Sequence, residues 1–173
     1  MMKKIIRPFA TTLLFFSLIQ SVDSPAQTVT QREIWVEKGT ATNTRRFNAQ
    51  HIDCLTKNIY YEAASEPWEG KVAVAQVTLN RVKSGKFPGD VCQVIYQKVQ
   101  SVCQFSWYCE KDIIKKPINI KAYLESMEVA KQVLLDNVRV RSVKASLFYH
   151  ADYIDPKWGK QPVTKIGRHI FYE

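Results

Sequence analysis

The chain has 173 residues, of which 46% are hydrophobic, and a formal net charge of +9. This length and composition fit one globular domain with a real core and exclude a chain that is disordered throughout. The basic charge favours a polyanionic partner, which could be nucleic acid, anionic lipid or an acidic cell-wall polymer.

The first 26 residues are predicted to be a secretory signal peptide. Lys3, Lys4 and Arg7 precede an apolar run, and Ser24 and Ala26 supply the small side chains that a signal peptidase reads. The alternative is an uncleaved N-terminal anchor, although the run is short for a membrane span. Export favours an anionic envelope polymer over nucleic acid, because the chain has no nucleic-acid-binding signature. We expect no stable membrane insertion after cleavage.

Residues 27–50 are rich in Thr, Gln, Asn and Arg and lack a sustained apolar pattern, so they are interpreted as an N-terminal arm or tether. Residues 51–173 contain no internal repeat and are predicted to form one domain. Most of this segment has helical periodicity, whereas its end is β-branched and aromatic. The sequence therefore predicts an α+β fold that is mainly helical, with a small β part near the C-terminus.

Two adjacent helices are predicted at the start of the domain. The first begins with Asp53 as its cap and runs to about Ala64. Glu66–Pro67 ends it and opens the second helix, which ends at Ser84–Gly85. The second helix is expected to be central and buried on most sides, with an apolar stripe that comprises Trp68, Val72, Ala75, Leu79 and Val82.

Further along the chain, a short helix is predicted around residues 89–99, with Asp90 as its cap. Asn119 is predicted to cap another helix, whose apolar repeat comprises Tyr123, Met127, Ala130 and Leu134. The segments ASLFYHADY (145–153) and VTKIGRHIFYE (163–173) predict strands or extended segments.

Four cysteines in an exported chain predict two disulfides among Cys54, Cys92, Cys103 and Cys109. The sequence leaves all three possible pairings open. A zinc site is the competing interpretation, but the chain has no C-x-x-C pair. We expect neither a metal nor another cofactor.

Three glutamates, Glu62, Glu66 and Glu69, lie beside the apolar run of the second helix. Glu62 follows two tyrosines at the end of the first helix and faces the central helix. A carboxyl group partly removed from water has a raised pKa and can act as a general acid, although from position alone Glu62 could also be a solvated helix residue. Glu69 lies in a first helical turn, where the helix dipole favours negative charge. Glu66 and Glu69 are therefore assigned structural roles.

The segment CLTKNIYYEAASEPWEGKVAVAQVTLNRV resembles the bacterial cell-wall hydrolase family typified by the spore cortex-lytic enzymes, the SleB-type hydrolases. The resemblance continues through FPGDVCQVIYQ, CQFSWYC, LFYHADYIDPKW and KIGRHIFYE, and covers nearly all of residues 54–173. It implies a lysozyme-like domain that cleaves the glycan strands of peptidoglycan at N-acetylmuramic acid. Two departures are Ala64–Ser65, where the family usually has Arg-Gly, and Glu110–Lys111, where it often has Asp-Gly.

The resemblance places the family's essential glutamate on Glu62. A lytic transglycosylase can work with one carboxyl group, so we expect this mechanism, with Glu62 as general acid and then base. One alternative is a hydrolytic muramidase or glucosaminidase, for which Asp112 or Asp152 would be the second acid. The other alternative is a non-catalytic peptidoglycan-binding protein with the same fold.

The matched motifs also imply a sugar-binding groove, with the candidate substrate-binding residues Tyr61, Gln104, Phe105, Ser106, Tyr149 and His150. Core packing is the competing interpretation for Phe105 and Tyr149, and a purely structural role is the competing interpretation for His150.

Three further polar residues are expected to be structural. Asn80 and Arg81, near the end of the central helix, are assigned hydrogen-bonding roles, and His169 is assigned to a terminal strand without a catalytic role. The expected partner is the peptidoglycan glycan strand, and the expected location is the cell envelope, either periplasmic or secreted.

Overall fold

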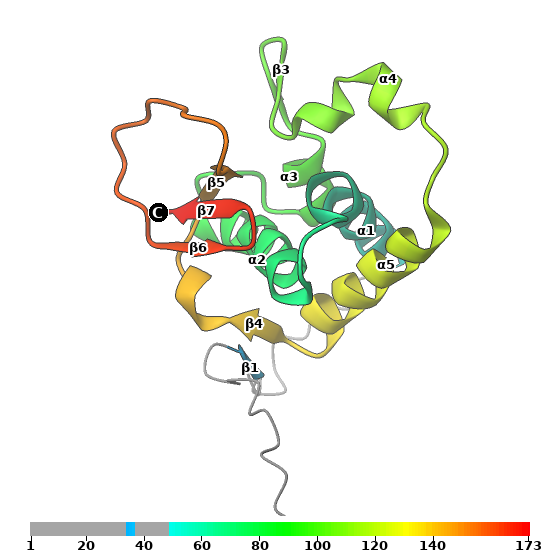
Figure 1. The fold of residues 1–173 in the computed structure, drawn as a ribbon, viewed down its shortest axis with the longest axis horizontal. Coiled ribbons are helices and arrows are strands. Elements are labelled where there is room, and N and C mark those ends of the chain that lie inside the picture. The colour runs from blue at the N-terminus through cyan, green and yellow to red at the C-terminus, as the bar shows by residue number, and fades with distance from the viewer. Residues whose placement is uncertain (1–33, 37–48) are drawn as a thin grey trace, which may run out of the picture.

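Three long helices form the main body of the computed structural model, which describes residues 34–36 and 49–173 (Figure 1). They are α1 (Ala49–Ala63), α2 (Trp68–Ser84) and α5 (Ile120–Leu135), and each packs against the other two. Between α2 and α5 lie α3 (Val91–Ile95), β2 (Lys98–Val99), β3 (Val102–Cys103), the 3-10 helix η1 (Ser106–Tyr108) and α4 (Lys111–Ile114). After α5 come β4 (Val138–Val140), the 3-10 helix η2 (Arg141–Val143) and the strands β5 (Phe148–Ala151), β6 (Thr164–Ile166) and β7 (His169–Tyr172).

The central helix is α2, and most of its side chains are buried, as predicted. Trp68 departs from the predicted stripe: its side chain is 40% exposed, and its indole N–H donates to Gln132 of α5 at 3.0 Å. The helix ends at Ser84 because Gly85 adopts a left-handed backbone with φ of 69°. The fully or nearly fully buried members of the stripe are Val72, Ala75 and Leu79.

The start of α1 differs from the prediction. The helix begins at Ala49, within the segment interpreted as an arm, so Asp53 is an internal helical residue and the prediction that it caps the helix was wrong. Its carboxylate instead accepts a hydrogen bond from Lys57 Nζ at 2.7 Å, one turn further on. The helix ends at Ala63, one residue before the predicted end.

Both of the other predicted caps are confirmed. The Asp90 side chain accepts a hydrogen bond from the backbone N–H of Gln93 at the start of α3, and Asn119 accepts one from Ala122 at the start of α5. The helix α3 is shorter than predicted, because the chain leaves it at Tyr96 and enters the β2–β3 hairpin.

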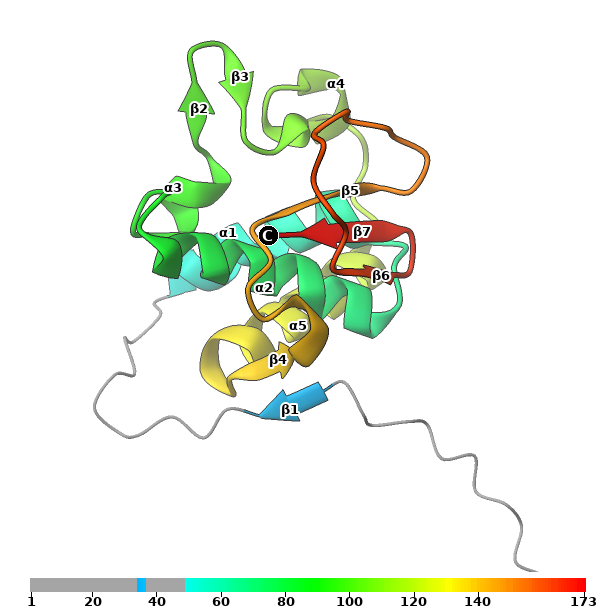
Figure 2. The ribbon, with the colours of Figure 1, turned by 90° about the vertical axis from the view of Figure 1, so that its left-hand side faces the viewer.

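The predicted β part near the C-terminus is confirmed as an antiparallel sheet with the strand order β5-β7-β6. Tyr149 of β5 lies opposite Phe171 of β7, and Ile166 of β6 lies opposite His169. Because β6 contacts α2, the sheet lies against the helical layer (Figure 2).

The strand β1 (Ile34–Val36) pairs with β4 and lies inside the segment interpreted as an arm. The predicted signal peptide, residues 1–26, lies outside the described residues. Within residues 34–36 and 49–173, no helix has the length and hydropathy that a membrane span requires.

Two disulfides confirm the prediction from the cysteine count. Cys54–Cys92 joins α1 to α3, and Cys103–Cys109 closes a short loop that contains η1. This loop, residues 103–109, is named the η1 loop below.

A buried carboxylate joins the turn between α1 and α2 to the turn between β6 and β7. Glu66 Oε2 accepts a hydrogen bond from the backbone N–H of Arg168 at 2.9 Å, and the Glu66 side chain is 5% exposed. Gly167 has a left-handed φ of 55°, and a Cβ atom at this residue would lie 1.9 Å from Glu66 Oε2. Glycine is therefore required here both by the backbone conformation and by the close approach of the carboxylate.

Removal of the Cys54–Cys92 disulfide is expected to cost more stability than removal of Cys103–Cys109. The first bridge spans a sequence separation of 38 residues and the second a separation of 6. The dependence of chain entropy on loop length gives losses of about 4 and about 2 kcal/mol, respectively. Urea unfolding of the two double-serine variants measures the difference, and equal losses would contradict this ranking.

Substitution of Gly167 by alanine should destabilise the protein more than the same change at Gly159. Both glycines have positive φ, but Gly159 has no atom within 4 Å of its Cβ position. Gly159→Ala should therefore cost only the backbone strain of about 1–2 kcal/mol. Gly167→Ala should cost about 1–3 kcal/mol more, because Glu66 must move. Thermal and urea unfolding of the pair test this, and indistinguishable losses would show that the Glu66 contact is not tight.

Candidate active site

A cleft of about 420 Å³ lies between the helical layer and the C-terminal sheet. Four parts of the chain form it: the end of α1, α2, the η1 loop with α4, and the sheet with the segment that follows β5. Its lining residues are Tyr61, Glu62, Arg81, Gln104, Phe105, Ser106, Trp107, Ile113, Phe148, Tyr149, His150, Ala151, Tyr153, Ile154, Trp158 and His169.

Glu62 lies in the last turn of α1, with its carboxyl group in this cleft. The side chain keeps a partly exposed face, but protein surrounds the carboxyl group on most sides. Burial is the largest cause of a pKa raised from 4.5 to about 7. At neutral pH the group therefore exists in both its neutral and its charged form, as a proton donor and acceptor requires.

Two neighbours oppose the effect of burial on the pKa of Glu62. The Tyr149 hydroxyl donates a hydrogen bond to Glu62 Oε2 at 3.1 Å, and the positive charge of Arg81 also favours the carboxylate. Burial raises the pKa of the Tyr149 phenol well above its ordinary value, so this hydroxyl remains a donor. The more distant Glu110 raises the pKa of Glu62 further. The protein therefore provides the Glu62 carboxylate with one hydrogen-bond donor, Tyr149, and one nearby positive charge, Arg81.

Arg81 serves both the fold and the cleft. Its Nε donates to the backbone carbonyl of Leu147 at 2.7 Å, and its guanidinium lies about 5 Å from the ring centres of Phe87 and Phe105. These contacts confirm the structural role predicted from the sequence. The structural role of Asn80 is also confirmed, because its side chain donates to the backbone carbonyls of Val143, at the end of η2, and Ser146. The position of Arg81 in the cleft, close enough to Glu62 to affect its pKa, was not predicted, since helical position alone does not show where the end of a long side chain lies.

All six predicted substrate-binding residues line the same cleft as Glu62. Gln104 and Ser106 lie in the η1 loop and add polar groups to its wall, as Tyr61 does from α1. Phe105 is 3% exposed and belongs to the hydrophobic core as well, so the packing interpretation also holds for this residue. Their place in one cleft is consistent with a groove for an extended ligand.

His150 has a protein partner for each ring nitrogen. Nδ1 lies 2.8 Å from the carbonyl oxygen of Ala151, and Nε2 lies 2.8 Å from the Tyr172 hydroxyl. A carbonyl only accepts, so Nδ1 carries the proton and Nε2 accepts from Tyr172 when the ring is neutral. The imidazole is thus held in place at the wall, where its ring can contact a ligand.

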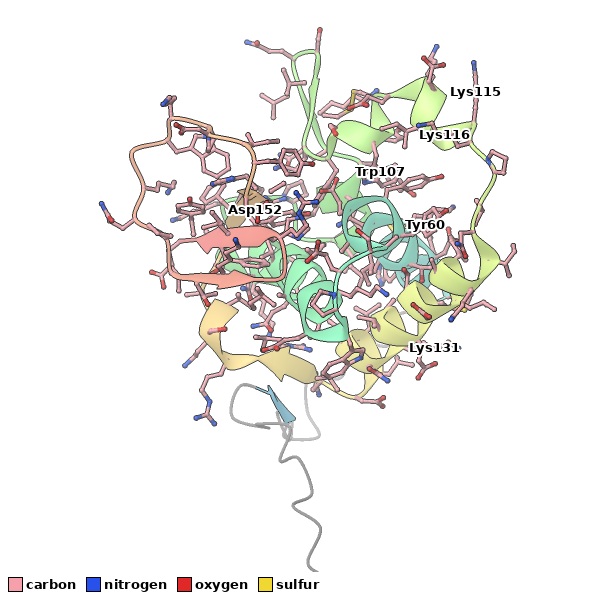
Figure 3. All side chains as sticks on the ribbon, in the orientation of Figure 1. Tyr60, Trp107, Lys115, Lys116, Lys131 and Asp152 are labelled. Carbon is pink, nitrogen blue, oxygen red and sulfur yellow. A yellow bond between two sulfur atoms is a disulfide. The ribbon has the colours of Figure 1, made fainter. Side chains whose placement is uncertain are left out.

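Several cleft residues were not predicted from the sequence. Trp107, labelled in Figure 3, lies in η1 within the CQFSWYC motif, and its indole N–H donates to Oδ1 of the buried Asn58 in α1 at 3.1 Å. His169 lies in β7 as predicted, but its ring also borders the cleft and contacts Tyr149 edge-on, with ring centres 5.1 Å apart. Trp158 reaches the cleft from the loop after β5, a contact that depends on tertiary structure.

Glu62 is the one carboxyl group among the described residues that line the cleft. Asp152, at the end of β5, forms ion pairs with Lys165 at 2.9 Å and Arg168 at 3.5 Å (Figure 3). Its hydrogen bond with Lys165 lowers its pKa, so Asp152 is a poor proton donor near neutral pH. Asp112 lies in the exposed first turn of α4 and does not line the cleft.

The residues at the two departures from the family pattern, Ala64–Ser65 and Glu110–Lys111, do not line the cleft either. Ala64 and Ser65 form the turn between α1 and α2, and Ser65 is exposed. Glu110 precedes α4 and acts on Glu62 only through its charge.

One group of three potential metal ligands occurs among the described residues, and it is not in the cleft. It consists of His51, Asp90 and Cys92. Cys92 is bonded to Cys54, so it has no thiolate to offer, and His51 Nε2 lies 2.6 Å from Asp90 Oδ2. The disulfide and this polar pair account for the group without a metal.

Comparisons of this chain with a family model and with curated sequences indicate the same family. The chain matches the family model described as Cell Wall Hydrolase over residues 65–172. It is 31% identical to a spore cortex-lytic enzyme of Bacillus subtilis (strain 168) over 131 residues, which are 73% of this chain and 39% of that protein. It is also 31% identical to one from Bacillus cereus over 129 residues, or 72% of this chain and 45% of that protein. The chain thus spans less than half the length of these curated relatives.

Two solved structures have a similar fold. The catalytic domain of the germination-specific lytic transglycosylase SleB from Bacillus anthracis has 26% sequence identity and a TM-score of 0.55, and the match covers 75% of this chain and 98% of that one. The catalytic domain of Bacillus cereus SleB has 27% identity and a TM-score of 0.52, with 78% and 99% covered.

The helical layer, the small C-terminal sheet and the cleft between them define a lysozyme-like α+β domain. The chain belongs to the cell wall hydrolase family of the SleB-type, or spore cortex-lytic, enzymes. The match to the family model begins at residue 65, three residues after Glu62, and so does not include this glutamate.

The stability of the wild type relative to a Glu62→Gln variant should fall as the pH rises. The raised pKa means that the folded protein keeps a proton that the unfolded chain has lost between pH 4.5 and about 7. This contribution is fully present below pH 4.5 and is lost as the pH rises through about 7. It amounts to about 3 kcal/mol, since each tenfold difference in proton affinity corresponds to about 1.4 kcal/mol. Urea unfolding of both proteins across this range measures it, and a constant difference would show that the pKa is not raised.

Proposed function

We propose that this protein cleaves the glycan strands of peptidoglycan as a lytic transglycosylase. The observation that carries the proposal is Glu62, a mostly buried carboxyl group with a pKa of about 7, in a cleft that no other carboxyl group lines among the described residues. Family membership and the lytic transglycosylase whose catalytic domain has the same fold support the choice of reaction.

In this mechanism Glu62 works first as an acid and then as a base. The neutral carboxyl group donates its proton to the glycosidic oxygen, and the bond between that oxygen and C1 of N-acetylmuramic acid breaks. The C6 hydroxyl of the same sugar attacks C1, and the Glu62 carboxylate accepts the hydroxyl proton. The product is a 1,6-anhydro sugar, and Glu62 returns to its starting protonation state without the addition of water.

Tyr149 and Arg81 have complementary roles in this cycle. Their hydrogen bond and positive charge stabilise the carboxylate that exists between the two proton transfers. Burial favours the neutral acid that begins the cycle. A pKa of about 7 lets both forms be reached at neutral pH, which is the condition for one group to perform both steps.

Simple hydrolysis fits the cleft less well. Glycoside hydrolases of the ordinary kind use two carboxyl groups about 5–10 Å apart across the bond. Asp152 is held in ion pairs and Asp112 lies on the outside of α4, so neither is placed to activate water or to attack the sugar. A non-catalytic binding protein would need the aromatic wall but would have no use for a buried carboxyl group with a neutral pKa.

We place the protein in the cell envelope, in the periplasm or outside the cell. Its proposed substrate lies there, and the two disulfides fit an oxidising compartment. The signal peptide predicted for residues 1–26 is consistent with export. The partner is the glycan strand itself, held by Tyr61 and the η1 loop on one side and by Tyr149 and His150 on the other.

Glu62→Gln should lower the rate of cleavage by about 10²–10⁴-fold, since glutamine keeps the shape of the side chain but cannot transfer a proton. Release of soluble fragments from purified sacculi measures the rate, and mass spectrometry of the wild-type products should show anhydro-muramic ends, lighter by one water than hydrolytic ends. Glu69→Gln, a charge-matched control outside the cleft, should remain active. Less than tenfold loss in Glu62→Gln would contradict the assignment, and exclusively reducing ends would exclude transglycosylation.

A further inference from the structure

A second cavity adjoins the cleft and shares two lining residues with it. Its volume is about 270 Å³, and we name it the tyrosine pocket. Tyr61 and Trp107 border both cavities, with their rings stacked 4.6 Å apart and tilted by 19°. The residues that line the tyrosine pocket are Lys57, Tyr61, Tyr96, Trp107, Tyr108 and Ile114.

The short helix α4 also borders both cavities. Ile113 lines the cleft, and the next residue, Ile114, lines the tyrosine pocket. The tyrosine pocket therefore adjoins the cleft at two places, at the Tyr61–Trp107 ring pair and at α4. The β2–β3 hairpin and α4 lie at the same end of the molecule (Figures 1 and 2).

The walls of the tyrosine pocket are fixed by contacts within the protein. The indole of Trp107 is anchored by its hydrogen bond to Asn58, and the rings of Tyr96 and Tyr108 lie 4.7 Å apart. A cavity whose aromatic walls are already in place loses little conformational entropy when a ligand binds.

Among the described tyrosines outside this pocket, all but Tyr153, which lines the cleft, have a hydrogen-bond partner for the hydroxyl group. They are Tyr60, Tyr123, Tyr149 and Tyr172. Within the part of the chain that the structure describes, the hydroxyls of Tyr61, Tyr96 and Tyr108 have none. The pocket is therefore lined by aromatic rings, three of which carry hydroxyl groups without a partner among the described residues.

We infer that the tyrosine pocket binds a further sugar residue of the glycan strand, beyond the two sugars whose bond is cleaved. A sugar ring offers apolar C–H surface and hydroxyl groups, the two properties that this pocket complements. The volume suits a single ring, since sites for larger, drug-sized ligands measure about 300–1,000 Å³. The inference rests on the proposed function, because the strand must lie across Glu62 in order to continue past Tyr61.

The test measures binding in the Glu62→Gln background, with peptide-free glycan oligomers from disaccharide to octasaccharide. Calorimetry should show that the affinity of the parent protein rises with oligomer length. Ile114→Glu should lower the affinity for the longest oligomer about tenfold, equivalent to about 1.4 kcal/mol, and leave the disaccharide unaffected. Ile114 is 42% exposed and outside the core, so the change should not prevent folding.

Ile118→Glu is the matched control. Ile118 is similarly exposed, at 45%, and carries the same change of charge, but it does not line the tyrosine pocket. It should bind every oligomer as the parent protein does. Tyr108→Leu keeps the apolar contact with the core and removes the hydroxyl and the ring, and it should reproduce the loss seen with Ile114→Glu.

Equal length dependence in the parent and in both pocket variants would overturn the inference, and so would an absence of glycan binding by the parent. A gain with length that appears only when stem peptides are attached would assign the pocket to peptide instead. The proposed function fails by a different result, namely the lack of anhydro ends in the products of the wild type. The two outcomes are thus read from separate experiments.

Discussion

The contact between Glu66 and the β6–β7 turn holds the two sides of the cleft in register. A hydrogen bond from a backbone N–H to a buried carboxylate is costly to break, because the carboxylate would remain buried without its partner. This contact ties the α1–α2 turn to the turn that leads into β7, and the β-ladder carries the constraint to β5. Glu62, four residues before Glu66, is thereby kept within hydrogen-bond distance of Tyr149, which is 87 positions away in the sequence.

The chemistry of the cleft depends on a balance between burial and two opposing interactions. Burial alone would keep Glu62 protonated and leave it unable to act as a base, whereas strong ion pairing, of the kind seen at Asp152, would keep it charged and unable to act as an acid. Arg81 does not form a direct ion pair with Glu62, because backbone carbonyl and aromatic contacts hold its guanidinium. The same packing that stabilises the domain thus sets the proton affinity of the central carboxyl group.

The sequence was most informative where structure is local. Asp90, Asn119 and Gly85 act on backbone groups within three residues or on their own φ angle, so their roles could be predicted from residue type. Asp53 shows the limit of such signals, because the helix continues upstream through residues without apolar periodicity. The disulfide pairing, the orientation of Arg81 and the approach of Trp158 depend on contacts between distant segments. The six predicted groove residues do share one cleft with Glu62, because the matched motifs carry information on tertiary structure that periodicity lacks.

The Cys103–Cys109 bond encloses Gln104, Phe105, Ser106 and Trp107, all of which face the cleft. These residues form one wall of the cleft. This wall is therefore complete only after the two cysteines have been oxidised to the disulfide, and folding alone does not complete it. A newly made chain in a reducing cytosol would carry this wall on an open, more mobile loop. Under the proposed function, such an order of events separates synthesis from full competence and leaves the final assembly of the cleft to the oxidising compartment in which the disulfide forms.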